Sequence, residues 1–275
     1  PTVLTVHDLR IARMPETYSR PRRLFLESVV PASLRRADRI VAVSNDTKQD
    51  LVEYFGVPPE KIAVSHNPVP AGFTRVEDRP LLESVRAKYG LPEAFILSVG
   101  KIEPRKNVDR LIEAFARAKE RFGVGLVVAG RRDPSFGGYH DRLMRMGAER
   151  GVVFTGYVDD ADLPALYTMA RLFAYPSLHE GFGIPVLEAM ACGTPVLTSD
   201  TSAIPGVAGD AAVLVDPESA ESIADGLERI LGDEPFRARL VERGYERARL
   251  FDAGRAAGAI VELYKKILFR PEPIC

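Results

Sequence analysis

Two adjacent cations, Arg105 and Lys106, lie between an apolar run at 95–99 and an amphipathic helical pattern that begins near Val108. Cations are unfavourable at the N-terminus of a helix because the helix dipole is positive there, so we expect an anion to compensate them. A diphosphate suits both side chains, since Arg offers a planar pair of donors and Lys a mobile charge. The alternative is that both side chains extend into solvent.

A second segment, residues 176–190, follows another apolar run and contains two carboxylates, Glu180 and Glu188. Gly183 lets the backbone approach a ligand closely, and the free amides of a helix that begins at Ile184 would attract the same anion. Glu188 precedes the apolar sequence Ala-Met-Ala-Cys, where a lone carboxylate is costly to bury. The hydroxyls of a ribose would satisfy Glu188, which leaves Glu180 to meet a different part of the same ligand.

Short apolar runs alternate with amphipathic patterns along the chain, and they must position these residues. Strands are expected at 3–6, 39–43, 62–65, 95–99, 126–129, 152–154, 172–175, 196–199 and 212–215. Helices are expected at 24–34, 47–55, 81–89, from 108, and at 139–149, 163–170, 184–191, 219–231, 235–251 and 255–269. This alternation predicts parallel sheets covered by helices, with ligands bound beyond the carboxyl ends of the strands.

The predicted elements form two series with a break at residues 67–72, where two prolines and a glycine interrupt all periodicity. We therefore expect a first domain at 1–75, a second at 76–252 and a final helical segment at 253–275 that packs back on the first domain. The chain starts at Pro1 and runs directly into an apolar stretch, which predicts that part of the N-terminal domain is absent.

Composition narrows the function classes. The chain has 275 residues, 46% of them hydrophobic, and a net charge of -1, which argues against a general nucleic-acid binder. The first 40 residues are nevertheless basic, which indicates either a solvated helix face or contact with an anionic membrane or a phosphorylated acceptor. Two cysteines, Cys192 and Cys275, cannot build a disulfide framework, so a cytoplasmic location fits best. No run approaches the length of a membrane span.

Several tempting motifs are discounted. Asp160-Ala161-Asp162 matches a metal-binding D-x-D pattern, but it precedes a helical segment and is better explained as a helix N-cap. The histidines and cysteines lack zinc-site spacing, so no metal site is predicted. The glycine patterns of dinucleotide-binding and hydrolase folds are missing from the sequence, which disfavours those enzyme classes.

The spacing of Glu180 and Glu188 inside HEGFGIPVLEAMACGTPV resembles the E-x7-E motif of retaining glycosyltransferases of the GT-B architecture, specifically bacterial family 4 (glycosyl transferases group 1). SLRRADRIVAVSNDTKQDL, ILSVGKIEPRKNVDRLIEAF and AVLVDP are similar to the same family in order and spacing. The resemblance covers essentially the whole chain. It implies an α/β fold with two Rossmann-like domains facing across a cleft, the N-terminal one incomplete here.

The resemblance also assigns expected roles. Arg105 and Lys106 would bind the diphosphate and stabilise the leaving group, and Glu188 would bind the ribose of a nucleoside diphosphate sugar, which serves as co-substrate. Glu180 and His7 would hold the donor sugar, His7 from the opposite domain. The remaining donor-binding residues implied are Gly100, Phe182, Gly183 and Ile184, which contact phosphate and sugar, and Tyr157 and Val158, which line the base pocket.

The implied activity is metal-independent transfer of a hexose or 6-deoxyhexose to a polysaccharide or lipid-linked acceptor, with retention of anomeric configuration, at the cytoplasmic side of a membrane. Two alternatives remain open. One is a non-catalytic nucleotide-sugar-binding protein, and the other is a GT-B relative that performs epimerisation or phosphorolysis. Phosphorolysis needs a separate inorganic phosphate site, whereas the sequence shows one basic cluster of the expected kind.

Overall fold

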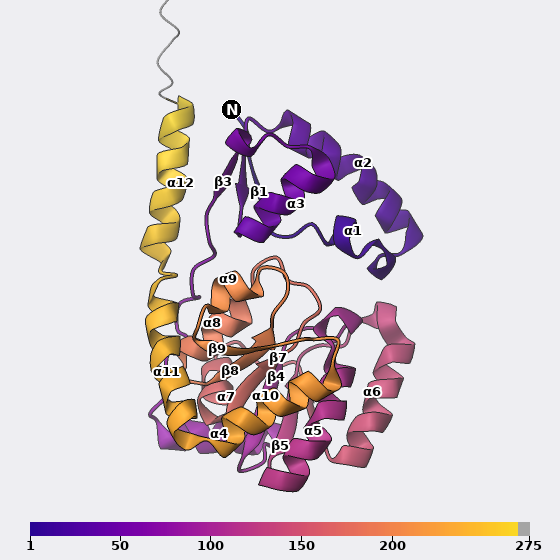
Figure 1. Cartoon of the computed structure of the whole chain (residues 1–275), viewed down its shortest axis with the longest axis vertical. Helices are drawn as coiled ribbons and strands as arrows, with labels where there is room; N and C mark the ends of the chain where they lie inside the picture. Colours follow the sequence, from indigo (N-terminus) through magenta and orange to yellow (C-terminus); the bar gives the residue numbers. More distant parts are fainter. Residues whose placement is uncertain (269–275) are drawn as a thin grey trace, which may run out of the picture. The chain divides into compact units, whose positions relative to one another are not determined.

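A computed structural model describes residues 1–268, which form two compact units (Figure 1). Unit 1 comprises Pro1–Pro68, Glu180–Phe182 and the chain from Phe251 onward, and unit 2 comprises Val69–His179 and Gly183–Leu250. The end of the segment predicted at 253–275, including Cys275, lies outside the described residues.

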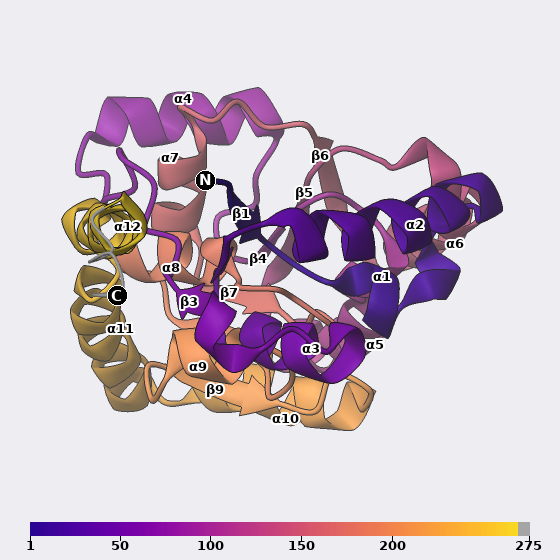
Figure 2. The same ribbon diagram turned by 90° about the horizontal axis from the view of Figure 1, so that it is seen from above.

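Unit 1 is built on a parallel three-stranded sheet in the order β1-β2-β3, formed by β1 (Val3–Val6), β2 (Arg39–Ala42) and β3 (Ile62–Val64). Its helices are α1 (Arg10–Arg13), α2 (Arg20–Arg36), α3 (Asn45–Phe55) and α12 (Ala253–Leu268), with 3₁₀ turns η1 (Pro15–Thr17) and η2 (Pro59–Lys61). Because both crossovers run in the same direction and are right-handed, α2 and α3 cover one face of the sheet. Figures 1 and 2 show α12 on the opposite side of that sheet.

Local sequence explains the ends of α3. Ser44 caps its N-terminus, because the hydroxyl accepts a hydrogen bond from the amide of Thr47 at 3.0 Å. Gly56 ends it in the left-handed conformation at φ 61°, which a glycine adopts without strain. Leu51 from this helix and Ile40 from β2 are fully buried in the core of unit 1. This core holds the carboxyl end of β1, where His7 follows, in a fixed place.

Unit 2 is built on a parallel six-stranded sheet in the order β6-β5-β4-β7-β8-β9. The strands are β4 (Phe95–Val99), β5 (Gly125–Ala129), β6 (Val153–Gly156), β7 (Leu172–Tyr175), β8 (Val196–Ser199) and β9 (Ala212–Val215). In chain order, β5 and β6 are added on one side of β4, and β7, β8 and β9 are then added on its other side. The carboxyl ends of β4 and β7 therefore form the switch point at which parallel sheets bind ligands.

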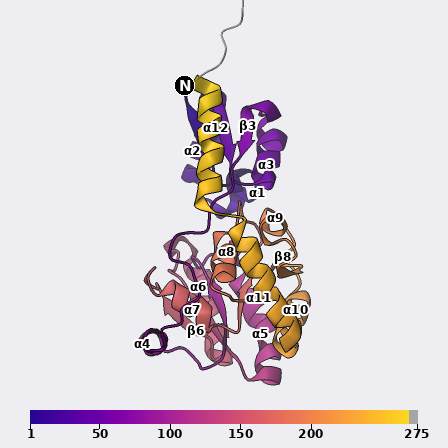
Figure 3. The same ribbon diagram turned by 90° about the vertical axis from the view of Figure 1, so that its left-hand side faces the viewer.

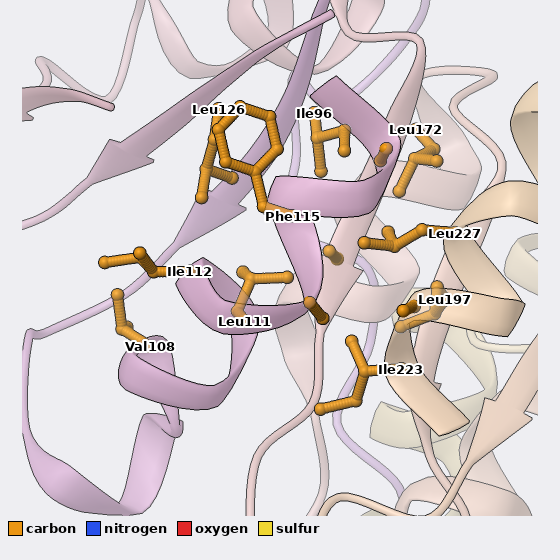
Figure 4. Packing of buried hydrophobic residues seen from close by; sticks show 14 of the residues in the cluster. Ile96, Val108, Leu111, Ile112, Phe115, Leu126, Leu172, Leu197, Ile223 and Leu227 are labelled. Carbon is orange, nitrogen blue, oxygen red and sulfur yellow. The ribbon is translucent and has the colours of Figure 1, made fainter. Parts of the chain in front are cut away.

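Helices cover both faces of this sheet. They are α4 (Arg79–Tyr89), α5 (Val108–Phe122), α6 (Gly137–Arg150), α7 (Leu163–Met169), α8 (Ile184–Ala191), α9 (Ile204–Ala208), α10 (Ala220–Gly232) and α11 (Glu234–Arg249), with η3 (Pro104–Lys106) and η4 (Pro134–Phe136). α5 packs on α10, and α8 packs on α11, as Figure 3 shows for the second pair. Leu111 and Phe115 of α5 lie among Ile96, Leu126 and Leu227 in the core (Figure 4).

The predicted fold class, α/β with two parallel sheets, is confirmed. All nine predicted strands are present within two residues of their expected ends. The sequence prediction missed α1 and α9, which are too short for a helical period to be visible.

One local prediction, the N-cap of the helix after Asp160-Ala161-Asp162, is correct in its position but wrong in its hydrogen bond. Asp162 occupies the N-cap position of α7 but makes no side-chain capping bond. Its carboxylate instead accepts hydrogen bonds from Lys88 Nζ at 2.7 Å and from Tyr89 Oη at 2.8 Å. The Lys88 ammonium of α4 carries a full positive charge, unlike the helix amides, so it forms an ion pair with the carboxylate in place of a capping bond.

The structure also shows the environment of Cys192 and the character of the helices with respect to a membrane. Cys192 is fully buried, and burial raises the pKa of its thiol to about 12, so it is a neutral packing residue at physiological pH. Across residues 1–268, none of the helices combines the length and apolar character that crossing a bilayer requires.

Candidate active site

Arg105 is held rigidly just beyond the carboxyl end of β4. Its Nε and Nη2 atoms donate to the Glu103 carboxylate at 3.1 and 2.7 Å, and Nη1 donates to the carbonyl of His179 at 2.6 Å. In return, the Arg105 carbonyl accepts a hydrogen bond from the amide of Leu178 at 2.9 Å. These bonds join the loop after β4 to the loop after β7, so the guanidinium is fixed at the switch point before any ligand binds.

The pairing with Glu103 corrects part of the sequence interpretation. We expected an external anion to compensate both cations, yet the protein itself supplies a buried carboxylate to Arg105. The cations also lie in η3, which precedes α5, so neither occupies the first turn of that helix.

Lys106 crosses from the β4 loop to β7. Its Nζ donates to the hydroxyl of Tyr175 and lies 4.6 Å from the centroid of that ring, a cation–π contact. Gly100 adopts φ 143°, and a Cβ there would meet Lys106 Cε at 3.4 Å. The absence of a side chain at Gly100 therefore leaves room for the lysine to extend along the switch point.

Asn107 is a positioning residue that the sequence interpretation did not select. It is completely buried in the left-handed conformation at φ 59°, and its Nδ2 donates to the carbonyls of Pro176 at 3.0 Å and Pro217 at 2.6 Å. It thus ties the loops after β4, β7 and β9 together. The available signal was the residue type, because Asn tolerates this conformation better than most side chains do.

A cavity of about 370 Å³ lies beside these loops in unit 2, lined by Gly100, Lys101, Arg131, Tyr157, Val158 and Asp160 among others. The Tyr157 side chain is half exposed, and the guanidinium of Arg131 lies 4.0 Å from its ring centroid. Lys101 pairs with Asp133 at 2.7 Å. The cavity therefore offers an aromatic face and charged groups. Arg131 and Asp160 were not predicted as site residues, although both follow strands at the sheet's carboxyl edge.

Two glycines bring the backbone together at this cavity. A Cβ on Gly130 would lie 1.8 Å from the carbonyl oxygen of Gly100, which leaves no space for any side chain. The loops after β4 and β5 consequently touch through their backbones.

α8 begins at Ile184, and the residue before it, Gly183, occupies the N-cap position with φ 109°. Inside this helix, the Glu188 carboxylate accepts a hydrogen bond from the Tyr167 hydroxyl at 2.8 Å. Burial raises the pKa of Glu188 to about 6, and the Asp160 carboxylate adds to the increase, while the Tyr167 bond opposes it. Glu188 therefore remains mostly ionised at neutral pH and has acceptor capacity left for a ligand.

His7, Glu180 and Phe182 all belong to unit 1. A Cβ on Gly181 would lie 2.0 Å from the carbonyl oxygen of His7, so this segment packs directly against the end of β1. The Phe182 ring stacks on His66 with centroids 5.8 Å apart. Its side chain is thus a packing group, and its backbone is the part left for a ligand.

The predicted site residues therefore divide between the two units. Unit 2 contains the residues expected to bind the diphosphate and nucleoside, namely Gly100, Arg105, Lys106, Tyr157, Val158, Gly183, Ile184 and Glu188. Unit 1 contains those expected to hold the donor sugar. A parallel α/β unit with preorganised cations at its switch point is typical of proteins that bind phosphorylated ligands.

Comparison with known proteins identifies the family. Residues 83–247 match the family model described as glycosyl transferases group 1, and residues 1–73 match that described as glycosyltransferase family 4. The chain therefore belongs to the family 4 (group 1) glycosyltransferases.

Individual relatives agree with this assignment. The chain is 32% identical to O-antigen chain mannosyltransferase B of Escherichia coli, over 96% of this chain and 70% of that protein. It is also 32% identical to the serotype-specific mannosyltransferase WbdA of Escherichia coli, over 97% of this chain but 34% of that much longer protein.

Solved structures share the fold. HepE of Anabaena, determined in complex with UDP and glucose, superposes with a TM-score of 0.83 at 22% identity, over 97% of this chain and 72% of that one. Sucrose-phosphate synthase of Thermosynechococcus elongatus gives a TM-score of 0.79 at 26% identity, over 96% of this chain and 67% of that one.

Proposed function

We propose that this glycosyltransferase moves a hexose or 6-deoxyhexose from a nucleoside diphosphate sugar to a polysaccharide or lipid-linked acceptor, with retention of configuration. The observation that carries the proposal is the pair of cations at the switch point, where Lys106 contacts Tyr175 and Arg105 is locked by Glu103. A site that is assembled before the ligand arrives needs little reorganisation when charge develops.

The proposed chemistry follows from these charges. As the bond between the anomeric carbon and the diphosphate breaks, negative charge grows on the departing phosphate oxygen. Arg105 and Lys106 stabilise that charge, with added help from the amides at Gly183 and Ile184. This role is the one that a divalent metal fills in other enzymes, so the proposed reaction requires no metal ion.

The nucleoside part of the donor occupies the rest of unit 2 in this proposal. Tyr157 and Val158 line the base cavity, Gly100 allows close approach of the phosphates, and Glu188 accepts hydrogen bonds from the ribose hydroxyls. Residues 76–252 thus act as the donor-binding domain.

The sugar and acceptor functions are assigned to unit 1. Glu180 and His7 hold the transferred sugar, and the backbone at Phe182 contributes a further contact. Residues 1–75 form the acceptor-side domain, and the helical segment at 253–275 completes it, in keeping with the hydrogen bond from Ser65 Oγ to the carbonyl of Ala256 in α12. Departure and attack on the same sugar face is proposed by analogy with the family.

The relatives support the substrate classes. Two of them are named as mannosyltransferases, one acting on O-antigen chains, which favours a hexose and a polysaccharide acceptor. HepE was solved with UDP and glucose, which favours a nucleoside diphosphate donor of a hexose.

A coupled assay of nucleotide release tests this function. We expect the chain to hydrolyse one of UDP-, GDP-, ADP- or dTDP-hexose slowly without acceptor, and EDTA should leave that rate unchanged. Nucleotide binding without turnover, even with oligosaccharide acceptors, would favour a non-catalytic binding protein. Release of a sugar 1-phosphate that depends on inorganic phosphate would favour a phosphorylase, and interconversion of two nucleotide sugars an epimerase.

We also propose that α2 contacts an anionic membrane surface near the acceptor. Leu24 and Phe25 are 66% and 62% exposed, and they follow Arg20, Arg22 and Arg23 in the same helix. Exposed apolar groups next to cations suit the boundary between lipid headgroups and acyl chains, where each cation contributes about 1 kcal/mol.

Vesicle co-sedimentation checks this contact. The chain should bind phosphatidylglycerol vesicles but not phosphatidylcholine vesicles, and the Leu24→Ser/Phe25→Ser variant should bind about tenfold more weakly. Leu214→Ser, which changes an exposed leucine of unit 2, serves as the matched control. Equal binding to both lipids, or no effect of the α2 variant, would contradict the proposal.

A further inference from the structure

A buried tyrosine supports the carboxylate proposed to bind ribose. Tyr167 in α7 has no exposed surface, and its hydroxyl donates to Glu188 Oε2 at 2.8 Å. The ring is clamped by edge-to-face contacts with Phe173 at 5.3 Å and Phe73 at 6.0 Å between centroids. Thr194 Oγ1 also donates to the Tyr167 carbonyl at 2.6 Å. The hydroxyl therefore has one well-defined direction.

This hydrogen bond links two neighbouring helices, because Tyr167 lies in α7 and Glu188 in α8. Among the described residues, Tyr167 alone donates a hydrogen bond to the Glu188 carboxylate. One carboxylate oxygen is thus anchored from the protein interior, and the acceptor sites that remain are available to a ligand.

We propose that Tyr167 is a positioning residue that orients Glu188 and favours its ionised form, so that the carboxylate can accept hydrogen bonds from the two ribose hydroxyls of the donor. This inference rests on the proposed ribose-binding role of Glu188. A phenol suits the task, since it donates to the carboxylate while its ring stays in the apolar core.

The other groups around Glu188 do not replace this bond. Asp160 and burial both disfavour the ionised carboxylate. The Cys192 thiol is neutral, because burial raises its pKa to about 12. At the far end of α8, Tyr245 from α11 and the Arg75 guanidinium face Gly193.

Tyr175 from β7 is the remaining titratable neighbour on the Tyr167 side, and its hydroxyl accepts from Lys106. Tyr167 itself stays neutral, since burial raises its pKa well above the ordinary value. The Tyr167 hydroxyl is consequently the group that favours ionisation of Glu188 by direct contact.

Donor affinity is expected to depend on pH through Glu188. The pKa of Glu188 is about 6, so donor affinity should fall as the pH drops through that value and the carboxylate gains a proton. Removing the Tyr167 hydroxyl removes the bond that lowers this pKa. In Tyr167→Phe the loss of affinity should therefore begin at a higher pH, and at neutral pH the ribonucleotide should bind about three- to tenfold more weakly. KM should rise while kcat changes little, because ribose takes no part in bond breaking.

The experiment is calorimetric titration from about pH 5 to 8.5, a range that brackets the Glu188 pKa. The probe is whichever of UDP, GDP and ADP the unmodified chain binds, together with its 2′-deoxy form. Glu188→Gln reports the titration of the nucleotide phosphate alone, so its profile is subtracted. Tyr139→Phe is the matched control, since the Tyr139 hydroxyl also donates to a carboxylate of unit 2, that of Asp109 at 3.0 Å.

The possible results of these titrations separate the role of Tyr167 from the proposed function. An upward shift of the pH midpoint in Tyr167→Phe, absent in Tyr139→Phe and much smaller with the 2′-deoxynucleotide, supports the inference. An unshifted profile in a folded Tyr167→Phe variant, with Glu188→Gln still impaired, overturns it and leaves the proposed function standing. Undiminished ribonucleotide binding by Glu188→Gln overturns the inference together with the proposed ribose-binding role of Glu188, and failure of the unmodified chain to bind UDP, GDP, ADP or dTDP overturns the proposed function as well.

Discussion

Replacing Arg105 and Lys106 together by alanine is expected to lower the rate of sugar transfer by at least about 10³-fold. Both cations are proposed to stabilise the diphosphate as it departs, and removing a single preorganised donor from such a site typically reduces turnover by about 10²–10³-fold. The measurement is the steady-state rate of nucleotide release, with folding checked by circular dichroism and thermal unfolding.

The two single variants should differ for a structural reason. Arg105→Ala removes a ligand contact and also leaves the buried Glu103 carboxylate without its guanidinium partner. The negative charge of Glu103 would then lie near the diphosphate without the positive charge of Arg105 to offset it, so this variant should be the more damaging one. Arg105→Lys should rescue little, because an ammonium group cannot reproduce the planar contacts to Glu103 and to the His179 carbonyl.

Lys106→Ala should be milder, because the Lys106 ammonium contacts the neutral hydroxyl of Tyr175, whereas Arg105 holds the buried carboxylate of Glu103. Arg117→Ala is the control, because this exposed arginine of α5 pairs with Asp225 and Glu228 far along the helix from the η3 loop. A double variant that keeps more than about a tenth of the activity would contradict the leaving-group role.

Glu180→Gln is expected to lower kcat by about 10²-fold or more while nucleotide affinity changes less than about twofold. Glu180 is proposed to hold hydroxyls of the transferred sugar, and interactions near the reacting carbon matter most in the transition state. A free nucleoside diphosphate lacks that sugar, so its dissociation constant should not respond.

Measurements of nucleotide affinity and of turnover separate the proposed roles of Glu180 and Glu188. Dissociation constants for the nucleoside diphosphate and kcat for the nucleotide sugar are compared in Glu180→Gln and in Glu188→Gln. We expect opposite patterns, with Glu188→Gln losing nucleotide affinity first. Equal losses of affinity and turnover in Glu180→Gln would show that the two carboxylates do not divide the donor between them.

Much of the fold could be predicted because its signals are local. The strand at Phe95–Val99 is a short apolar run, and the helix that follows carries Leu111 and Phe115 at helical spacing, so the pattern indicates each element directly. By contrast, α9 has five residues and contains Pro205 and Gly206, which by composition alone indicate a loop.

The residue types allow a candidate site to be proposed from the sequence, but the contacts that connect those residues could not be predicted. Lys106 and Tyr175 are 69 positions apart, and only the strand order β4-β7 brings them together. The same holds for Asn107, whose partners Pro176 and Pro217 lie on two other loops. Such hydrogen bonds depend on which strands are neighbours in the sheet. A local sequence pattern indicates where each strand lies along the chain but not which strands lie beside it.

Charge compensation was the hardest feature to predict. The cations next to α5 indicated a missing anion, yet Glu103 lies two residues before Arg105 and serves that purpose. Asp162 showed the reverse case, in which a residue placed as a cap pairs with Lys88 from another helix. A side chain pairs with the strongest partner that lies close to it, and the folded structure determines which groups lie close.

Calorimetric titration of the unmodified chain with UDP, GDP, ADP and dTDP tests the donor site most directly, alongside Glu188→Ala and the Arg105→Ala/Lys106→Ala variant. We expect one nucleotide to bind, and both variants to lose most of that affinity. Failure of the folded chain to bind any of the four, or binding that survives unchanged in both variants, would contradict a nucleoside diphosphate sugar site at the carboxyl ends of β4 and β7.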